Sequence, residues 1–246
     1  MKVSVIIPIY NEEKTITNVV DVLSKSRLID KIICVNDCST DKSLSILRSF
    51  GNKINLVSLP KNYGKGYALV EGVKIAKNEL VMFLDGDLIN LSDAHIQALF
   101  RPIEKSDKIR AVIGNPIANS KKIWHFSGLW SSLSGERVYY RKDLLPHLKY
   151  LAKTRFGAEI YLNQLFTKDE TAKVPLKNLD MLFKHEKFRT KKAIKEWLRE
   201  LAEITQEVGK REGILPKNYD SIIKFVTNPS LKTIKGKLAD YLNGQF

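Results

Sequence analysis

VSVIIPIYNEE at residues 3–13 shows the pattern that decides the fold: an apolar, β-branched run that ends in a group of polar residues. Three more apolar runs follow: KIICV (31–35), INLVSL (54–59) and LVMFL (80–84). A segment with helical spacing separates each run from the previous one. Near-continuous apolar strands that alternate with helices are typical of a parallel sheet covered on both faces. The sequence therefore predicts an α/β fold with a mostly parallel, twisted sheet flanked by helices.

The spacing of the apolar residues also indicates the remaining elements. We expect helices at 12–25, 41–50, 65–77, 92–105, 143–152, 157–167 and 190–208. Strand-like segments lie at 110–114 and 136–141, and shorter extended pieces lie at 171–176 and 180–185. The basic tail at 209–246 is interrupted by Pro216 and Pro229, which predicts a small helical appendage. We therefore expect one domain at 1–189 and a C-terminal helical extension at 190–246.

The composition is that of an ordinary globular domain. The 246 residues are 43% hydrophobic and 28% charged, which is enough for one sizeable core. No apolar run approaches the roughly 20 residues of a membrane-spanning helix, and the opening segment is interpreted as a buried strand rather than a signal peptide. Cys34 and Cys38 lie four residues apart without a nearby His, so we expect neither a disulfide framework nor a zinc site. A reducing cytoplasm is the expected location.

The net charge of +14 indicates an anionic partner: nucleic acid, an anionic membrane surface or a phosphorylated substrate. Much of the excess lies at 101–155, where 12 Lys and Arg against 4 Asp and Glu give a net charge of +8. Arg137, Arg141 and Lys142 lie in this stretch. They could form a cradle for an anionic acceptor or leaving group, or simply belong to a solvated strand and turn.

Asp85 and Asp87 follow the fourth apolar run directly, with only Gly86 between them. In open α/β sheets, ligands bind at the carboxyl ends of the strands. Two carboxylates this close repel each other unless a cation joins them, and a divalent cation with oxygen ligands does so while keeping positions for phosphate oxygens. The pair therefore predicts a metal site, although an Asp-Gly turn exposed to solvent is the alternative interpretation.

Two further groups follow the other strands. Asn62-Tyr63-Gly64-Lys65-Gly66 opens a helix, where the glycines permit close backbone approach and Lys65 could offer a charge to a diphosphate. The segment is not a P-loop, because GxxxxGK[ST] is absent, and a Gly-rich loop with a surface lysine is the simpler alternative. Asp37 could begin a turn and cap a helix, or it could accept a hydrogen bond from a nucleobase.

SVIIPIYNEE (4–13), VNDCSTD (35–41), NYGKGYAL (62–69) and FLDGD (83–87), in this order, resemble the amino-terminal half of the family 2 glycosyltransferases. That family has the GT-A fold. The resemblance implies a nucleotide-binding half at 1–90 and an acceptor half at 91–189. It also implies a nucleoside held by Pro8, Tyr10, Glu12 and Asp37, with Lys65 near the base or the diphosphate and a metal on Asp85 and Asp87. Asn36-Asp37-Cys38 departs from the more usual Asp-Asp-Gly, but Asp37 is kept.

The second half resembles soluble polyprenyl-phosphate sugar synthases and glucosyl-phosphoglycerate synthases. The similar segments are SGERVYYRKDLL (134–145), FGAEIYLNQLF (156–166) and DMLFKHEKFR (180–189). This resemblance implies a carboxylate near the acceptor at Glu159 and a metal-shell histidine at His185. Either residue could instead be exposed and without a role. The QxxRW motif of the processive members is absent, so a polymer-extruding synthase is not expected.

These observations predict an enzyme that moves a hexosyl group from a UDP or GDP sugar to an acceptor that carries phosphate, either a polyprenyl phosphate or a small metabolite. Mg²⁺ or Mn²⁺ would neutralise the leaving diphosphate. Asp87 and Glu159 are the expected catalytic residues, although an ionised phosphate acceptor needs no general base. A lipid acceptor would require peripheral contact at the inner membrane surface.

Three rival functions fit the sequence less well. A nucleotidyltransferase shares the sheet architecture, but it would carry a Gly-rich signature after the first strand, where Pro8-Ile9-Tyr10-Asn11-Glu12 stands. A nucleic-acid-binding module would need stacking aromatics or a recognised motif, so no nucleic-acid partner is expected. The intact pair of Asp85 and Asp87 argues against a non-catalytic sugar-nucleotide binder.

Overall fold

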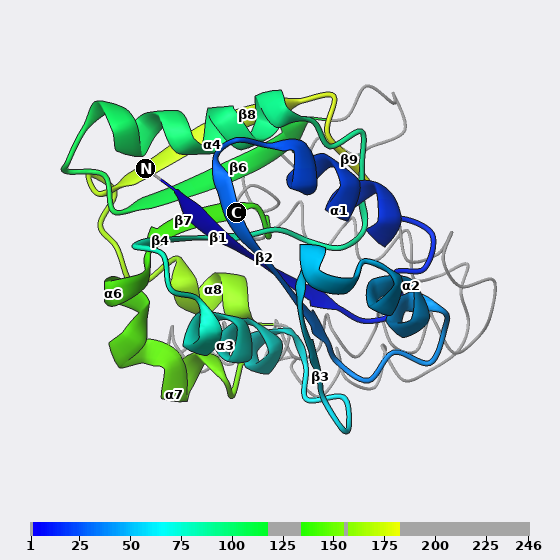
Figure 1. The fold of residues 1–246 in the computed structure, drawn as a ribbon. Coiled ribbons are helices and arrows are strands. Elements are labelled where there is room, and N and C mark those ends of the chain that lie inside the picture. The colour runs from blue at the N-terminus through cyan, green and yellow to red at the C-terminus, as the bar shows by residue number, and fades with distance from the viewer. Residues whose placement is uncertain (1, 118–133, 155–156, 183–246) are drawn as a thin grey trace, which may run out of the picture. The chain divides into compact units, whose positions relative to one another are not determined.

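Figure 1 shows the fold in a computed structural model, which describes residues 2–117, 134–154 and 157–182. The chain divides into two compact units, Met1–Leu182 and Phe183–Phe246. The second unit lies outside the described residues, and so do His185 and the predicted helix at 190–208. The predicted domain boundary at 189 and the helical extension therefore stay predictions.

Four parallel strands form one half of the main sheet, as the apolar runs predict. They are β1 (Val3–Ile9), β2 (Ile29–Asn36), β3 (Asn55–Ser58) and β4 (Leu80–Phe83). β1 lies between β2 and β4, and its Ile6 pairs with Ile33 on one side and Phe83 on the other. All residues of β1 except the half-buried Pro8 are buried, on both faces of the sheet, which explains why its sequence is almost continuously apolar rather than alternating.

The other half of this sheet is mixed. β6 (Ala111–Ile117), β7 (Arg137–Tyr140) and β8 (Thr171–Lys177) complete the order β3-β2-β1-β4-β7-β6-β8. β7 runs antiparallel to β4 and β6, whereas β6 and β8 are parallel. The strand-like segments predicted at 110–114, 136–141 and 171–176 are confirmed. A separate two-stranded sheet pairs β5 (Leu88–Ile89) with β9 (Asp180–Met181), which accounts for the start of the extended piece predicted at 180–185.

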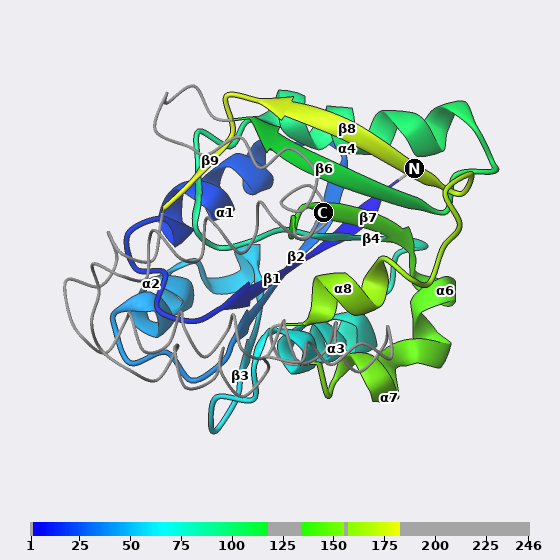
Figure 2. The same ribbon diagram turned by 180° about the vertical axis from the view of Figure 1, so that it is seen from behind.

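Helices cover both faces of the main sheet (Figures 1 and 2). One face carries α1 (Ile16–Lys25), α4 (Asp93–Lys105) and, next to α1, α2 (Ser43–Ser49), which is followed by the short 3-10 helix η1 (Gly51–Lys53). The other face carries α3 (Lys65–Ile75), α7 (Leu148–Leu151) and α8 (Ala158–Leu162). Each face has its own apolar cluster: Val5 and Ile7 of β1 belong to the first, and Ile6 belongs to the second. This arrangement confirms the predicted sheet with flanking helices.

The helix predicted at 12–25 begins only at Ile16, and two further predicted helices differ more from their expected bounds. The segment at 143–152 forms three pieces, α6 (Arg141–Leu144), the 3-10 helix η2 (Leu145–His147) and α7, because Pro146 has no N–H to continue the helical ladder. The helix predicted at 157–167 ends at Leu162, after which Phe166 stacks on Tyr139 with ring centroids 5.5 Å apart. None of the described helices is long and apolar enough to cross a membrane.

Candidate active site

The polar segments that follow β1 and β2 lie side by side at the carboxyl edge of the sheet. The parallel register pairs Ile9 with Asn36, so both strands end at the same level. The backbone N–H of Glu12 donates to the Ser43 hydroxyl at 2.7 Å, and the Asn11 side-chain oxygen accepts from the N–H of Thr40 at 2.8 Å. These hydrogen bonds hold the two loops together as one rim of the site.

The loop after β1 also contacts the Asp85-Gly86-Asp87 turn. The Thr15 hydroxyl donates to the carbonyl of Gly86 at 2.8 Å. A Cβ atom added to Gly86 would lie 3.1 Å from Cγ of Glu12, so the two segments are in close contact. Pro8, Tyr10 and Glu12 are half-buried at this edge. The sheet therefore brings the three residues expected to hold a nucleoside next to the predicted metal motif.

Asp37 is buried beneath the Gly-rich loop. Its side-chain oxygens accept the backbone N–H groups of Tyr63 and Gly64, both at 2.7 Å, and only 3% of the residue is exposed. Gly64, which directly precedes α3, has a φ of 94°. Residues with a side chain rarely adopt this backbone conformation. Asp37 thus fixes the entry of α3, a role that sequence reasoning did not foresee, whereas its contact with a nucleobase stays a prediction.

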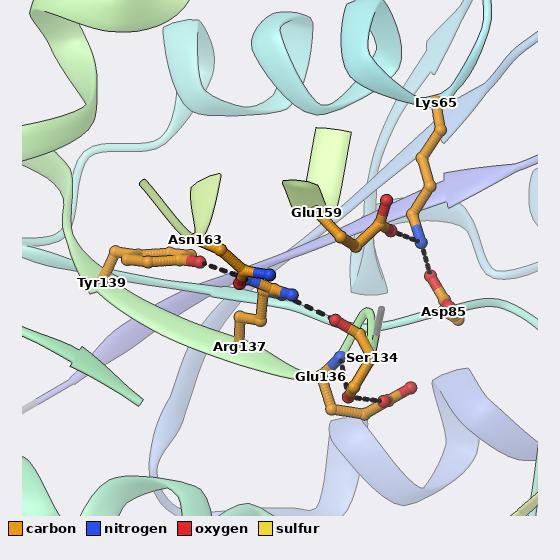
Figure 3. A network of polar contacts seen from close by, with 8 residues as sticks. All are labelled: Lys65, Asp85, Ser134, Glu136, Arg137, Tyr139, Glu159 and Asn163. Carbon is orange, nitrogen blue, oxygen red and sulfur yellow. Dashed lines mark hydrogen bonds and ion pairs between the residues drawn. The ribbon is translucent and has the colours of Figure 1, made fainter. Parts of the chain in front are cut away.

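Lys65 joins two carboxylates that come from different elements (Figure 3). Its Nζ lies 2.6 Å from Oδ1 of Asp85 and 2.5 Å from Oε1 of Glu159, which is on α8. Burial lowers the pKa of Lys65. The charges of Asp85 and Glu159 raise it by more than burial lowers it, so the pKa of Lys65 is well above its ordinary value. The three side chains are mostly buried, and the amine stays a cation at neutral pH.

Asp85 and Asp87 could hold a divalent cation. Both are half-buried, and the backbone carbonyl of Asp87 accepts from the N–H of Leu182 at 2.9 Å, which fixes the end of the turn. Among residues 2–117, 134–154 and 157–182, no group of three or more His, Cys, Asp and Glu forms a metal site. Two carboxylates still suit Mg²⁺ or Mn²⁺, because such ions take their other oxygen ligands from phosphates and water. The third predicted ligand, His185, lies outside the described residues.

Glu136 is a buried acid beside this motif that sequence reasoning missed. The residue has no solvent exposure, and the Ser134 hydroxyl donates to its Oε2 at 2.5 Å. Burial and, to a smaller extent, the charge of Asp85 raise the pKa of Glu136 to about 7. Its Oε1 accepts no hydrogen bond from the described residues. The alternation of the predicted strand at 136–141 could have revealed the burial of Glu136, because it places Glu136 on the same side as Val138 and Tyr140, which belong to the apolar core.

Gly135 provides the space in which the side chain of Asp85 lies. A Cβ atom at Gly135 would come within 2.4 Å of Oδ2 and 2.5 Å of Oδ1 of Asp85. Any other residue at 135 would push this carboxylate away from its place. The Gly135 position therefore fixes where Asp85 can sit, although the glycine itself carries no functional group.

Arg137 is a buried structural cation rather than part of an open cradle. Only 1% of the residue is exposed. Its guanidinium donates to the Ser134 carbonyl at 2.6 Å, to the Tyr139 hydroxyl at 3.1 Å and to the Asn163 side chain at 2.7 Å (Figure 3). Asn163 directly follows α8, so Arg137 ties the segment around Gly135 to the helix that carries Glu159.

Arg141 lies at the opposite edge of the sheet. β7 runs antiparallel to β4, with Arg137 paired to Phe83 and Tyr140 paired to Leu80. Arg141 follows Tyr140 and donates from Nε to the carbonyl of Val73 at 3.0 Å. The full length of β7 separates the two arginines, because Arg137 is its first residue and Arg141 follows its last, which corresponds to about 13 Å at roughly 3.3 Å per residue. This geometry corrects the prediction that Arg137 and Arg141 line one acceptor site, because strand direction takes Arg141 away from Asp85.

Comparisons with known proteins agree with this geometry. A family model described as "Glycosyl transferase family 2" matches residues 4–155. Poly-beta-1,6-N-acetyl-D-glucosamine synthase of Staphylococcus epidermidis is 35% identical over 122 residues, which cover 48% of this chain and 29% of that protein. Undecaprenyl-phosphate 4-deoxy-4-formamido-L-arabinose transferase of Enterobacter sp. is 31% identical over 131 residues, which cover 50% of this chain and 39% of that protein. The chain thus spans less than half the length of these curated relatives.

The fold is also similar to that of solved structures. Glucosyl-3-phosphoglycerate synthase from Mycobacterium tuberculosis, solved with Mn²⁺, UDP-glucose and phosphoglyceric acid, superposes with a TM-score of 0.66 at 23% sequence identity. The superposition covers 88% of this chain and 82% of that one. The same enzyme with Mg²⁺ and UDP gives a TM-score of 0.66. At this identity the similarity establishes the fold, and it confirms the predicted GT-A type.

Proposed function

Since this chain belongs to glycosyl transferase family 2, we propose that it transfers a hexosyl group from a UDP or GDP sugar to an acceptor that carries phosphate. One observation carries the proposal above all: Lys65, Asp85 and Glu159 converge at the carboxyl edge of the sheet, beside the rim formed by the loops after β1 and β2. Ligands of open α/β sheets bind at this edge.

The nucleotide would lie along the rim. Pro8, Tyr10 and Glu12 would contact the nucleoside from the loop after β1, and Asp37 would do so from the end of β2. The buried hydrogen bonds of Asp37 to the Gly-rich loop support a rigid floor beneath this position. Lys65 would take the diphosphate, because it is a mostly buried amine at the start of α3 whose pKa is raised by the neighbouring carboxylates.

Asp85 and Asp87 would hold Mg²⁺ or Mn²⁺, with His185 as a further ligand implied by the family resemblance. The metal would neutralise the charge that develops on the leaving diphosphate. The reaction forms a bond between the acceptor oxygen and the anomeric carbon and breaks the bond between that carbon and the diphosphate oxygen. Glu159 would face the acceptor, and a phosphate acceptor is already ionised, so Glu159 would orient it or accept a proton from a hydroxyl acceptor.

The phosphate on the acceptor is supported by charge and by relatives. The net charge of +14 favours anionic ligands, and most of it comes from residues other than Arg137, which is buried, and Arg141, which lies at the far edge. A relative is named as an undecaprenyl-phosphate transferase, and the similar solved enzyme was crystallised with phosphoglyceric acid. Either a polyprenyl phosphate or a small phosphorylated metabolite fits this chemistry.

Turnover of a panel of UDP and GDP sugars, with product analysis, tests the proposal. We expect hydrolysis or transfer from at least one donor only when Mg²⁺ or Mn²⁺ is present, and no turnover by Asp87→Ala. The variant should fold like the wild type, which circular dichroism checks. Full turnover in excess chelator would refute the metal assignment. Absence of any thermal shift with UDP or GDP in the presence of metal would refute the nucleotide site.

Sedimentation with anionic vesicles separates the two acceptors. A lipid acceptor would require the chain to dock at the inner membrane surface from the cytoplasm, and each Lys or Arg near an anionic leaflet contributes about 1 kcal/mol. Binding to vesicles that disappears at high salt supports a lipid acceptor. Failure to sediment at low salt, together with transfer to a small phosphorylated metabolite, supports the other.

A further inference from the structure

Lys65 occupies the place where a cation is needed between two acids. Its Nζ lies 2.6 Å from Asp85 and 2.5 Å from Glu159, and the exposed fractions of the three side chains are 19%, 21% and 8%. Charges that are this far from water attract each other much more strongly than surface ion pairs do. The two carboxylates come from the end of β4 and from α8, so the ammonium also holds these two elements together (Figure 3).

We propose that Lys65 is the resident counter-ion of the metal-binding carboxylate: it occupies Asp85 in the metal-free protein and opposes the entry of a divalent cation until a nucleotide diphosphate arrives. The inference rests on the proposed function for the identity of that nucleotide. A divalent cation on Oδ1 of Asp85 would meet the ammonium that already lies 2.6 Å from this atom. Two cations on one carboxylate oxygen repel each other, so either the metal stays out or Lys65 gives up the contact.

The diphosphate resolves this competition because it brings negative charge for both cations. With phosphate oxygens present, Lys65 can exchange Asp85 for a phosphate while it keeps its second partner, Glu159. Metal and nucleotide then bind together rather than independently. Such coupling is reciprocal: the factor by which UDP tightens Mn²⁺ binding equals the factor by which Mn²⁺ tightens UDP binding.

A titration with Mn²⁺ alone tests the counter-ion directly. The free ion would be measured by electron paramagnetic resonance on the full chain, without nucleotide, for the wild type and for Lys65→Met. Lys74→Met is the matched control, because Lys74 lies on the same helix and pairs with Glu71 at 2.7 Å, in an exposed position. Both variants remove one positive charge, but only one removes it from Asp85.

Lys65→Met should bind Mn²⁺ at least about tenfold more tightly than the wild type, whereas Lys74→Met should match the wild type. The gain should disappear when Asp85→Asn is added to Lys65→Met. Equal Mn²⁺ affinity in Lys65→Met and the wild type, or no Mn²⁺ binding by Lys65→Met at millimolar concentration, would overturn the proposal. Lys65→Gln provides a second variant if the methionine variant does not fold.

A comparison of Mn²⁺ binding with and without UDP gives an independent test. Mn²⁺ should bind at least about tenfold more tightly with saturating UDP than without it, and Lys65→Gln should show a smaller factor. Equal Mn²⁺ affinity with and without bound UDP would contradict the counter-ion. Failure of the proposed function has a different signature: no nucleotide sugar turns over and UDP does not bind, while the comparison with metal alone still decides the role of Lys65.

Discussion

Replacement of Glu136 with Gln should remove a marked pH dependence from the stability of the metal-free protein. The Glu136 carboxyl group has no solvent exposure, and burial is the largest cause of its raised pKa. The charge of Asp85 raises the pKa further, whereas the Ser134 hydroxyl and the charge of Lys65 lower it. Gln keeps the shape of the side chain and an oxygen that can accept from Ser134, but it cannot ionise. The substitution therefore isolates the cost of the buried charge.

The sign and size of the effect follow from the two pKa values. The pKa of Glu136 rises from 4.5 in the unfolded chain to about 7 in the folded one. Between these values the folded protein binds more protons, so the free energy of unfolding falls as the pH rises from 4.5 towards 7 and then levels off. One pKa unit corresponds to about 1.4 kcal/mol, which gives a loss of about 3 kcal/mol above pH 7. Glu136→Gln should not show this loss.

Urea unfolding from pH 5 to pH 8, in chelator and without nucleotide, measures the effect. The stability of Glu136→Gln relative to the wild type should increase by about 2–3 kcal/mol across this range, because a small part of the loss has already occurred at pH 5. Glu104→Gln is the matched control, because Glu104 is exposed on α4. A relative stability that stays constant with pH, or that falls as the pH rises, would show that Glu136 is not held as a buried acid of raised pKa.

Three further substitutions test single contacts. Gly135→Ala would place a Cβ 2.4 Å from the Asp85 carboxylate. The affinity for Mn²⁺ in the presence of UDP, measured by calorimetry, should therefore fall by at least about tenfold while the Tm changes little, and wild-type affinity would contradict this. Asp37→Asn places an amide against two backbone N–H groups, so urea unfolding should reveal a loss of about 1–3 kcal/mol, and an unchanged midpoint would argue against these bonds. Gly72→Ala would place a Cβ 2.2 Å from Cγ2 of the buried Ile6, so the same measurement should show a loss of about 1–3 kcal/mol, with wild-type stability as the contrary result.

The fold could be predicted because its central strands, β1 and β4, are buried on both faces. Val5 and Ile7 of β1 contribute to one apolar cluster and Ile6 to the other, so the strand is apolar on both faces apart from Ser4. Such runs are easy to distinguish from amphipathic helices. The breaks in the helix at 143–152 were less visible, although Pro146 gives their physical reason.

The site could be predicted only as far as strand ends reveal it. The position of Asp37 and Asp85 follows from parallel strands that end at one edge, which the sequence indicates. Arg137 and Arg141 show what the sequence does not indicate. Arg137 begins β7 and Arg141 begins α6 directly after it, and only the antiparallel pairing of β7 with β4 shows that one lies near the site and the other at the far edge. Charge counts also do not distinguish the buried guanidinium of Arg137 from a solvated one.

The structure also changes the argument for the metal itself. Asp85 and Asp87 indicate a divalent cation because two neighbouring carboxylates need a positive charge, yet Lys65 already provides one at Asp85 from within the chain. Repulsion between acids is therefore not sufficient to require a metal here. What would require it is the nucleotide: a diphosphate adds negative charge that one lysine cannot balance, because this amine also serves Glu159. The metal requirement of the site is then a property of the bound nucleotide, because Lys65 already serves as a cation for Asp85 and Glu159.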